Sequence, residues 1–244
     1  MPNSFLAYAW ASNLERLAIA AAVTLGFAVL ARLVRGVSRS GMLAGGCACF
    51  LLFTSAGPAA FAALTALFAL TWAATRLGFR RKQELGVAER GDGRNAWQVL
   101  ANLGVAALAS VSLSATGKWA WLVAASAALA EAATDTVASE IGQTHRTARL
   151  ITTWETVPAG TDGGVTPLGT AAGAFAGLLV AGVSAGAGMI PQAQLWIPVA
   201  AGFAGMLIDS ILGATVQRRR WLNNEAVNLL GTLAAAGIAY LIAQ

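Results

Sequence analysis

The sequence is poor in charged residues and in side chains that bind transition metals. Only 11% of its 244 residues are charged, whereas about 25% is typical of soluble domains. It has one histidine, His145, and two cysteines, Cys47 and Cys49, in an apolar segment. A zinc or redox centre needs more ligands than these, so we interpret the cysteines as small packing residues. The scarcity of charge indicates a membrane protein.

Hydrophobic residues make up 57% of the chain and fall into segments long enough to cross a membrane. We predict an all-α, polytopic transmembrane helix bundle that forms a single integral membrane domain over residues 1–244. The eight predicted spans are residues 14–34, 42–57, 58–78, 95–114, 118–141, 167–186, 192–216 and 224–243. The second span is short and is followed directly by Gly57-Pro58, so seven spans are the alternative.

The positive charges are distributed unevenly between the two sides of these spans. The ends of the first, third, fifth and seventh spans, together with the loops that follow them, hold Arg32, Arg35, Arg39, Arg76, Arg80, Arg81, Lys82, Arg90, Arg94, Arg146, Arg149, Arg218, Arg219 and Arg220. Of the 16 lysines and arginines, only Arg16 and Lys118 lie elsewhere. By the positive-inside rule these segments are cytoplasmic and both termini lie outside. The net charge of +5 follows from this topology, and we expect no nucleic-acid partner.

Three carboxylates lie well inside the predicted spans, away from the span ends. Glu131 and Asp135 lie in the fifth span and Asp209 lies in the seventh. An ionised group inside hydrocarbon costs at least ~2.5–3.5 kcal/mol, so such residues usually have a function. Glu131, Asp135 and Ser139 are spaced four residues apart, which places them on one helix face. The spacing predicts an ionic site inside the bundle.

Amide side chains occur at a similar depth in two other spans. The fourth span begins with Asn95, Gln98 and Asn102 on one face, and the eighth begins with Asn224 and Asn228 on one face. Such residues also serve as simple hydrogen-bonding contacts between membrane helices. Because they coincide in depth with the carboxylates, we predict one polar site in the cytoplasmic half of the membrane.

The segment before the sixth span has features of an anion site. It contains Asp162-Gly163-Gly164, and Thr166 and Pro167 are typical of an N-cap and a first helical residue. Glycines before a helix N-terminus let backbone N–H groups approach an anion, which the helix dipole also favours. We expect this segment to hold phosphate groups. The alternative is that these residues only mark the start of a helix and bind no anion.

A weak repeat links the two acidic spans. Asp135-Thr136 is followed by Gln143, and Asp209-Ser210 is followed by Gln217 at the same distance. Matched spacing in two helices is typical of a duplicated element, although two short segments can also match by chance.

The residue types suit phosphoryl transfer. Carboxylates and amides are hard oxygen ligands, which suit Mg²⁺ rather than zinc. We predict that Glu131, Asp135 and Asp209 are catalytic and converge around Mg²⁺, whose remaining ligands would be water and substrate phosphates. Positioning and charge neutralisation are nearly all that phosphoryl transfer requires of a protein. The apolar surroundings would receive a lipid tail, which predicts a lipid-linked phosphoryl-transfer enzyme facing the cytoplasm.

Five motifs, in order along the chain, resemble the integral membrane family known as domain of unknown function ninety-two. The motifs are Thr75-Arg76-Leu77-Gly78 through Lys82, Arg94-Asn95-x-x-Gln98 through Asn102, Thr134-Asp135-Thr136 through Gly142, Asp162-Gly163-Gly164-Val165-Thr166 through Thr170, and Asp209-Ser210-x-x-Gly213-Ala214. The resemblance covers nearly the whole chain. From these motifs we add to the candidate substrate- and nucleotide-binding residues Arg76, Lys82, Glu140, Gly169, Thr170 and Ser210.

The resemblance implies a specific activity. The characterised plant and cyanobacterial members of this family are phytyl-phosphate kinases, which convert a prenyl monophosphate to the diphosphate with a nucleoside triphosphate, notably CTP. By resemblance, this protein is expected to be a prenyl-phosphate kinase in the plasma membrane of a bacterium, with a prenyl-phosphate lipid and a nucleoside triphosphate as its partners.

Other interpretations stay open at the level of sequence. An acceptor phosphate has its second pKa near 6 and needs no base, whereas an alcohol acceptor would need one, such as Glu131 or Asp135. A secondary transporter of an anion or lipid phosphate would also have polar half-helices and pseudo-repeats. Transporter sites usually lie at the membrane midplane, whereas this polar cluster lies toward one face, which favours the enzyme. A structural scaffold would leave the carboxylates without a role.

Overall fold

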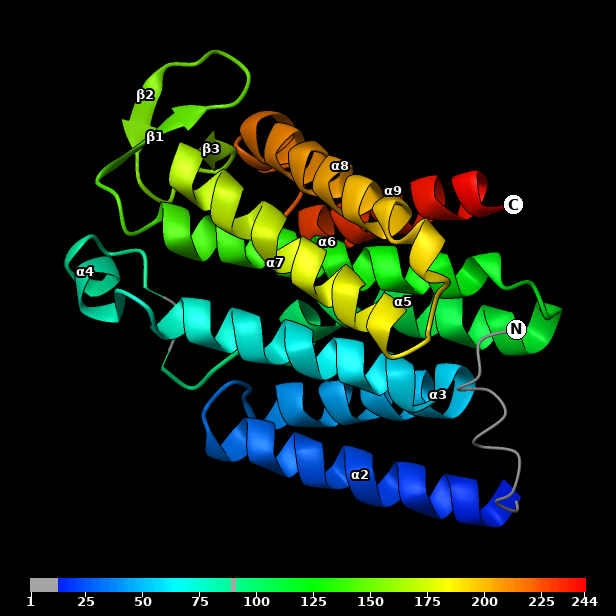
Figure 1. The fold of residues 1–244 in the computed structure, drawn as a ribbon. Helices are drawn as coiled ribbons and strands as arrows, with labels where there is room; N and C mark the ends of the chain where they lie inside the picture. The colour runs from blue at the N-terminus through cyan, green and yellow to red at the C-terminus, as the bar shows by residue number, and fades with distance from the viewer. Residues whose placement is uncertain (1–12, 89–90) are drawn as a thin grey trace.

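The protein is a bundle of long helices with a small sheet at one end (Figure 1). The computed structural model describes residues 13–88 and 91–244, so Arg90 of the predicted basic loop lies outside the described residues. The helices are α2 (Asn13–Leu33), α3 (Arg39–Arg76), α4 (Phe79–Glu84), α5 (Ala96–Thr116), α6 (Ala120–Gly142), α7 (Pro167–Gly186), α8 (Trp196–Leu212) and α9 (Asn224–Ala243).

Six helices of the described chain are long and apolar enough to cross a membrane. They are α2, α3, α5, α7, α9 and the segment Gln192–Gln217, which contains α8. The helix α6 has 23 residues, but Glu131, Asp135 and Glu140 lower its hydropathy. The predicted membrane-spanning helix bundle is therefore confirmed, and the predicted number of crossings stays a prediction.

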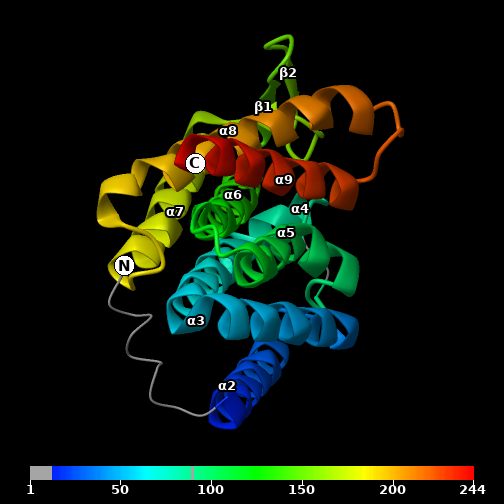
Figure 2. The ribbon, with the colours of Figure 1, turned by 90° about the vertical axis from the view of Figure 1, so that its right-hand side faces the viewer.

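The predicted second and third spans form a single element in the structure. Within α3, Gly57 has φ 78° and ψ −173°, and Pro58 follows it. The rings of Phe53 and Phe61 are 5.6 Å apart, whereas eight residues of straight helix would separate them by ~12 Å along the axis. The break at Gly57 thus folds α3 into a first arm before Gly57 and a second arm after it (Figures 1 and 2).

The helix α6 forms the centre of the bundle (Figure 2). Apart from Trp121, every residue from Ala120 to Thr134 is buried. This helix contacts α3, α5, α7, α8 and α9. Its run of alanines lets the neighbouring helices approach closely, as small residues do at helix interfaces in membranes. The surrounding helices consequently position whatever polar groups α6 presents.

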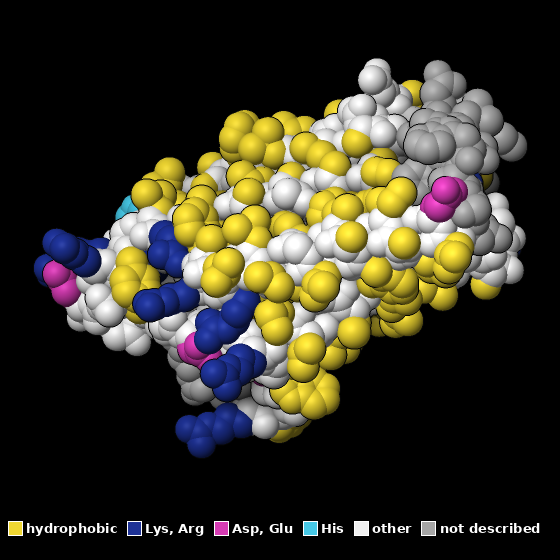
Figure 3. Space-filling model, turned by 90° about the horizontal axis from the view of Figure 1, so that it is seen from below, with side chains coloured by type: hydrophobic (Ala, Val, Ile, Leu, Met, Phe, Trp, Pro, Cys, Tyr) yellow, Lys and Arg dark blue, Asp and Glu magenta, His cyan; other side chains and the backbone are white. Residues whose placement is uncertain are grey.

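The connections separate into two ends of the bundle. The α2–α3 connection, α4, the small sheet and the α8–α9 connection lie at one end, which we call the loop end, and the C-terminus lies at the other (Figure 1). On the face formed by the first helices, Lys and Arg side chains gather toward one end and hydrophobic side chains cover most of the rest (Figure 3). This segregation agrees with the charge asymmetry predicted from the sequence.

A three-stranded antiparallel sheet follows α6, where the sequence analysis predicted only a loop. It consists of β1 (Thr147–Leu150), β2 (Thr156–Pro158) and β3 (Gly164–Val165), in the order β2-β1-β3. Strands of four, three and two residues are too short to produce a recognisable alternation of polar and apolar residues. The prediction of an all-α fold was therefore wrong for this segment.

Two other helix boundaries bear on the site. Thr166 is the N-cap of α7, where its Oγ1 accepts a hydrogen bond from Gly169 N at 3.1 Å and Pro167 is the first helical residue. This start was predicted from the sequence and is confirmed. The helix α8 ends instead in a π-helical turn, Gly213–Gln217, which the sequence analysis did not predict.

We predict that Gly57→Ala destabilises the protein by about 1–3 kcal/mol, because the backbone conformation at this position is almost restricted to glycine. No atom lies within 4 Å of a Cβ added here, so the penalty would come from the backbone alone. Thermal unfolding of the purified protein in detergent measures it. Gly104→Ala, also in open space but with an ordinary helical backbone, is the control and should be neutral or stabilising. Equal unfolding temperatures of the two variants would contradict the prediction.

Candidate functional site

A polar cavity of about 210 Å³ lies among α5, α6, α7, α8, α9 and the small sheet. It collects predicted site residues from segments that are far apart in the sequence. Those that line it are Gln98, Asn102, Asp135, Ser139, Glu140, Asp162, Gly163, Gly164, Thr166, Thr170, Asp209, Ser210, Asn224 and Asn228. The structure thus brings most of the predicted residues to one place, while their chemical roles stay predictions.

Two carboxylates face this cavity from different helices. Asp135 belongs to α6 and Asp209 to α8, and they lie close enough for their charges to interact. When the amide of Asn228 is oriented so that both of its polar atoms have partners, its nitrogen donates to Asp209 Oδ2 at 3.2 Å and to the carbonyl oxygen of Asn224 at 3.1 Å. The polar face of α9 therefore orients the carboxylate of Asp209.

Glu131 lies outside the cavity lining and is enclosed by the glycine faces of α8 and α9. It is 1% exposed. A Cβ on Gly231 would lie 2.5 Å from Glu131 Oε1, and a Cβ on Gly205 would lie 2.6 Å from Glu131 Cγ. Among the described residues, Oε1 has no hydrogen-bond partner. The side chain is therefore tightly confined, with one carboxylate oxygen unsatisfied.

Arg94 lines the cavity but was not among the predicted site residues. It is the positive charge that acts on Asp135. Its backbone is held by the α2–α3 connection, because Ser38 N donates to Arg94 O at 2.9 Å and Arg94 N donates to Gly36 O at 3.2 Å. The sequence contained a signal, since Arg94 begins the motif that continues through Asn102, but its charge was explained by topology alone.

The two glutamines of the weak repeat also line the cavity. Gln217 Nε2 donates to Asp162 Oδ1 at 3.0 Å, which joins the end of the π-helical turn to the glycine-rich segment. Burial of part of the Asp162 side chain raises the pKa of its carboxyl group, and the positive charge of Arg218 opposes this shift. Gln143 and Gln217 could have been selected from the matched Asp-to-Gln spacing.

Packing explains why glycines occur in the segment Asp162–Thr166. Gly163 has φ 73°, and a Cβ added to it would collide with Ala214 in the π-helical turn. Gly164 lies in β3, where a Cβ would be 2.9 Å from the carbonyl oxygen of Thr161. Substitution of either glycine would therefore disturb the packing, and phosphate binding by this segment stays a prediction.

Four further predicted residues lie outside the cavity lining: Asn95, Gly169, Arg76 and Lys82. Asn95 caps α5, since its side chain accepts from the backbone of Trp97 and Gln98 and its own N–H donates to Gln98 Oε1 at 2.9 Å. Gly169 is used for close contact between α7 and α6, where a Cβ would be 3.1 Å from Gly142 Cα. The structure gives both residues local roles in folding.

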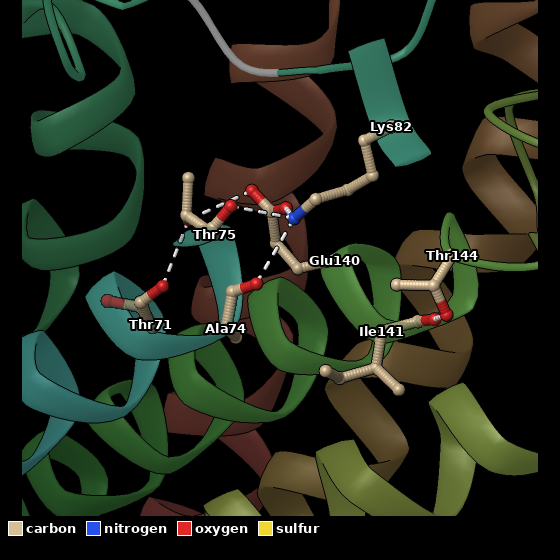
Figure 4. Close-up of polar contacts among 7 residues, drawn as sticks. All are labelled: Thr71, Ala74, Thr75, Lys82, Glu140, Ile141 and Thr144. Carbon is tan, nitrogen blue, oxygen red and sulfur yellow. Dashed lines mark hydrogen bonds and ion pairs between the residues drawn. The ribbon is translucent and has the colours of Figure 1, made fainter. Parts of the chain in front are cut away.

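Lys82 is part of a buried polar network (Figure 4). Its side chain is fully buried, and Nζ donates to Glu140 Oε2 at 2.5 Å, to Ala74 O at 3.1 Å and to Thr75 O at 2.8 Å. Thr75 Oγ1 donates to Glu140 Oε1 at 2.9 Å. All three ammonium hydrogens thus have partners, so Lys82 joins α4 to α3 and α6 and has no donor left for a ligand.

The carboxylates are also candidate metal ligands. Within residues 13–88 and 91–244, no group of three or more His, Cys, Asp and Glu side chains is arranged to hold a metal ion. The predicted convergence of Glu131, Asp135 and Asp209 around a metal ion stays a prediction. Mg²⁺ requires only one or two carboxylates, with water and phosphates as its other ligands. Asp135 and Asp209, which share the cavity with amide oxygens, fit that requirement.

Six helices long and apolar enough to cross a membrane, with a polar cavity among them, are typical of a polytopic integral membrane protein. Residues 22–236 match the family model described as integral membrane protein DUF92. The chain therefore belongs to this family, which confirms the resemblance drawn from its five motifs.

The chain is similar to several proteins along most of its length. It is 33% identical over 196 residues to an uncharacterized membrane protein of Synechocystis, sll0875, with 78% of this chain and 76% of that protein covered. It is 31% identical over 222 residues to Protein VTE6, chloroplastic, of Arabidopsis thaliana, with 87% and 67% covered. It is 31% identical over 234 residues to an uncharacterized membrane protein of Methanocaldococcus jannaschii, MJ0933, with 94% and 95% covered. No solved structure matches the chain.

We predict that Lys82→Met destabilises the protein by about 3–5 kcal/mol, because it leaves the Glu140 carboxylate buried without its charge partner. Adding Glu140→Gln to Lys82→Met should restore part of the loss. Unfolding of the purified protein in detergent measures both effects. Arg81→Met is the matched control, since the contact of Arg81 with Glu84 is a partly exposed 3.8 Å ion pair of the kind worth about 0–1 kcal/mol. Comparable destabilisation by Lys82→Met and Arg81→Met would contradict the role of the network.

Proposed function

We propose that this protein is a prenyl-phosphate kinase that uses CTP or another nucleoside triphosphate as the phosphoryl donor. The observation behind the proposal is that Asp135 and Asp209 share one cavity with the glycine-rich Asp162–Thr166 segment, at the loop end of an apolar bundle. Membership of the family, and the resemblance of five motifs to phytyl-phosphate kinases, support the same activity. The acceptor is a prenyl monophosphate with a phytyl-like chain.

The reaction needs little chemistry from the protein itself. A terminal oxygen of the prenyl monophosphate attacks the γ-phosphorus of the nucleotide and forms a new P–O bond. The bond between this phosphorus and the β–γ bridging oxygen breaks, and the nucleoside diphosphate leaves. Because the second pKa of a monophosphate is near 6, the acceptor is already largely ionised and no general base is required. Catalysis then depends on alignment and charge neutralisation.

The residues around the cavity divide into groups that suit this reaction. Asp135 and Asp209 would hold Mg²⁺, which when bound neutralises phosphate charge. Arg94 lines the same cavity as Asp135 and would supply positive charge toward the phosphates. The amide of Asn228 keeps the carboxylate of Asp209 oriented. The α7 N-terminus adds the positive end of a helix dipole.

The kinase proposal includes a topology. Eight crossings result if α6 and both arms of α3 each span the membrane. The loop end, with its arginines, faces the cytoplasm, and both termini face outward. Nucleoside triphosphates are cytoplasmic, so this orientation supplies the donor to the cavity. We place the protein in the plasma membrane of a bacterium.

The central experiment mixes purified protein, a prenyl monophosphate, Mg²⁺ and each nucleoside triphosphate, and detects prenyl diphosphate. We predict that Asp135→Asn and Asp209→Asn each reduce the rate about 100-fold or more, because each removes a carboxylate that would hold Mg²⁺ beside the phosphates. Asp92→Asn is the control, since Asp92 is exposed and contacts Arg32 outside the polar cavity. Absence of diphosphate with every nucleotide, or Asn variants as active as wild type, would reject the kinase. Nucleotide-independent movement of lipid phosphate across vesicles would favour a transporter.

The topology is tested by cysteine labelling. In a protein with Cys47 and Cys49 replaced by alanine, single cysteines at Arg80, Arg146 and Arg219 should react only with a reagent on the cytoplasmic side. A cysteine at Lys118 should react only from outside, because it lies at the opposite end of the bundle. Labelling of positions 118 and 219 from the same side would contradict the eight-crossing topology.

A further inference from the structure

A second, larger cavity lies beside the polar one. Its volume is about 390 Å³, and α2, both arms of α3 and α5 form its walls. Most of its lining is apolar, including Phe27, Leu64, Phe68 and Leu103. A pocket of about 300–1,000 Å³ is typical of sites for small molecules and cofactors, so this cavity is large enough for a ligand.

The cavity is long in the direction of the helices. Along the second arm of α3 its lining extends from Arg76 to Leu64, which corresponds to ~18 Å of helix. Along the first arm it extends from Gly41 at the loop end to Cys49. Half of a ~30 Å hydrocarbon layer is ~15 Å, so the cavity is about as deep as one lipid chain is long.

Positive charge is concentrated where this cavity approaches the loop end. Arg35, Arg76 and Arg94 are its lining arginines. Arg76 Nη2 donates to the carbonyl oxygen of Val34, and its guanidinium lies 4.6 Å from the centre of the Trp72 ring, so this side chain is held in place. The charges complement an anionic head group, whereas the deep part of the cavity complements a hydrocarbon chain.

The two cavities meet at the same residues. Arg94 and Asn102 line both of them. A molecule with a phosphate in the polar cavity would therefore have an apolar space directly beside its attachment point. Small residues keep that space open. A Cβ added to Gly45 or to Gly46 would have only one atom within 4 Å, at a distance of 3.6 Å.

We propose that the apolar cavity binds the prenyl chain of the lipid phosphate, with Arg94 at the phosphate end and Cys49 at the deep end. This inference rests on the proposed function and adds the site that selects chain length. The chain runs between the two arms of α3, and the side chains at positions 45 and 49 set how much of it fits.

The two native cysteines provide a matched pair for the test. Cys49 is 2% exposed and lines the cavity, whereas Cys47, two residues earlier, is exposed and lies outside its lining. Cys49→Phe should weaken binding of a twenty-carbon prenyl monophosphate roughly tenfold, because lost space in an apolar pocket has effects of this size. Binding of a ten-carbon prenyl monophosphate should be unchanged. Cys47→Phe should change neither. Binding is measured on purified protein without nucleotide.

A second pair of variants tests the inference even if Cys49→Phe fails to fold. Gly45→Leu should show the same selective loss for the longer chain, and Gly26→Leu, an exposed position with open space around it, should bind like wild type. Unfolding temperatures are recorded for all four variants.

Wild-type binding of the twenty-carbon lipid by both Cys49→Phe and Gly45→Leu would overturn the inference, and diphosphate formation would still test the kinase separately. The expected binding pattern without diphosphate formation from any nucleotide would instead support the chain site and reject the kinase. A uniform loss of both chain lengths would also overturn the assignment, since it would place the effect at the phosphate.

Discussion

The burial of α6 determines how the neighbouring helices are arranged. This helix is central and has three carboxylates, and each one imposes a requirement on its neighbours. Glu131 has room only because glycines of α8 and α9 face it. Glu140 is neutralised by Lys82, which reaches it from α4. Asp135 faces a cavity together with Arg94. Polar groups in an apolar interior must be paired or functional, so α6 organises both the packing and the site.

The position of Arg94 connects the two cavities. Its backbone is fixed by hydrogen bonds to Gly36 and Ser38, so the α2–α3 connection at the edge of the bundle determines where a charge in the centre lies. The break at Gly57 has a related effect, because it turns α3 into two arms that form walls of the apolar cavity. A polar head site and an apolar chain site thus become neighbours through two local backbone features.

Sequence spacing was sufficient where the residues share one helix. Asp135 and Ser139 were placed on one face by helical periodicity, and Thr166-Pro167 was identified as a helix start by its capping chemistry. The same reasoning could not assign Asn95, because an N-cap and a ligand-binding amide have the same sequence pattern at the start of a span. For Gly163 the sequence suggested anion binding, whereas the packing against Ala214 is a contact between segments about fifty residues apart.

The membrane class, the approximate helix boundaries and the segregation of charge follow from the amino-acid sequence, because these depend on local composition and on the cost of placing polar groups in hydrocarbon. The packing of the helices is needed to show that Lys82 pairs with Glu140, that Arg94 and Asp135 line one cavity, and that an apolar cavity lies beside the polar one. These contacts depend on how helices cross and on which small residues let them approach. That geometry arises from packing between distant segments, which no single stretch of sequence encodes.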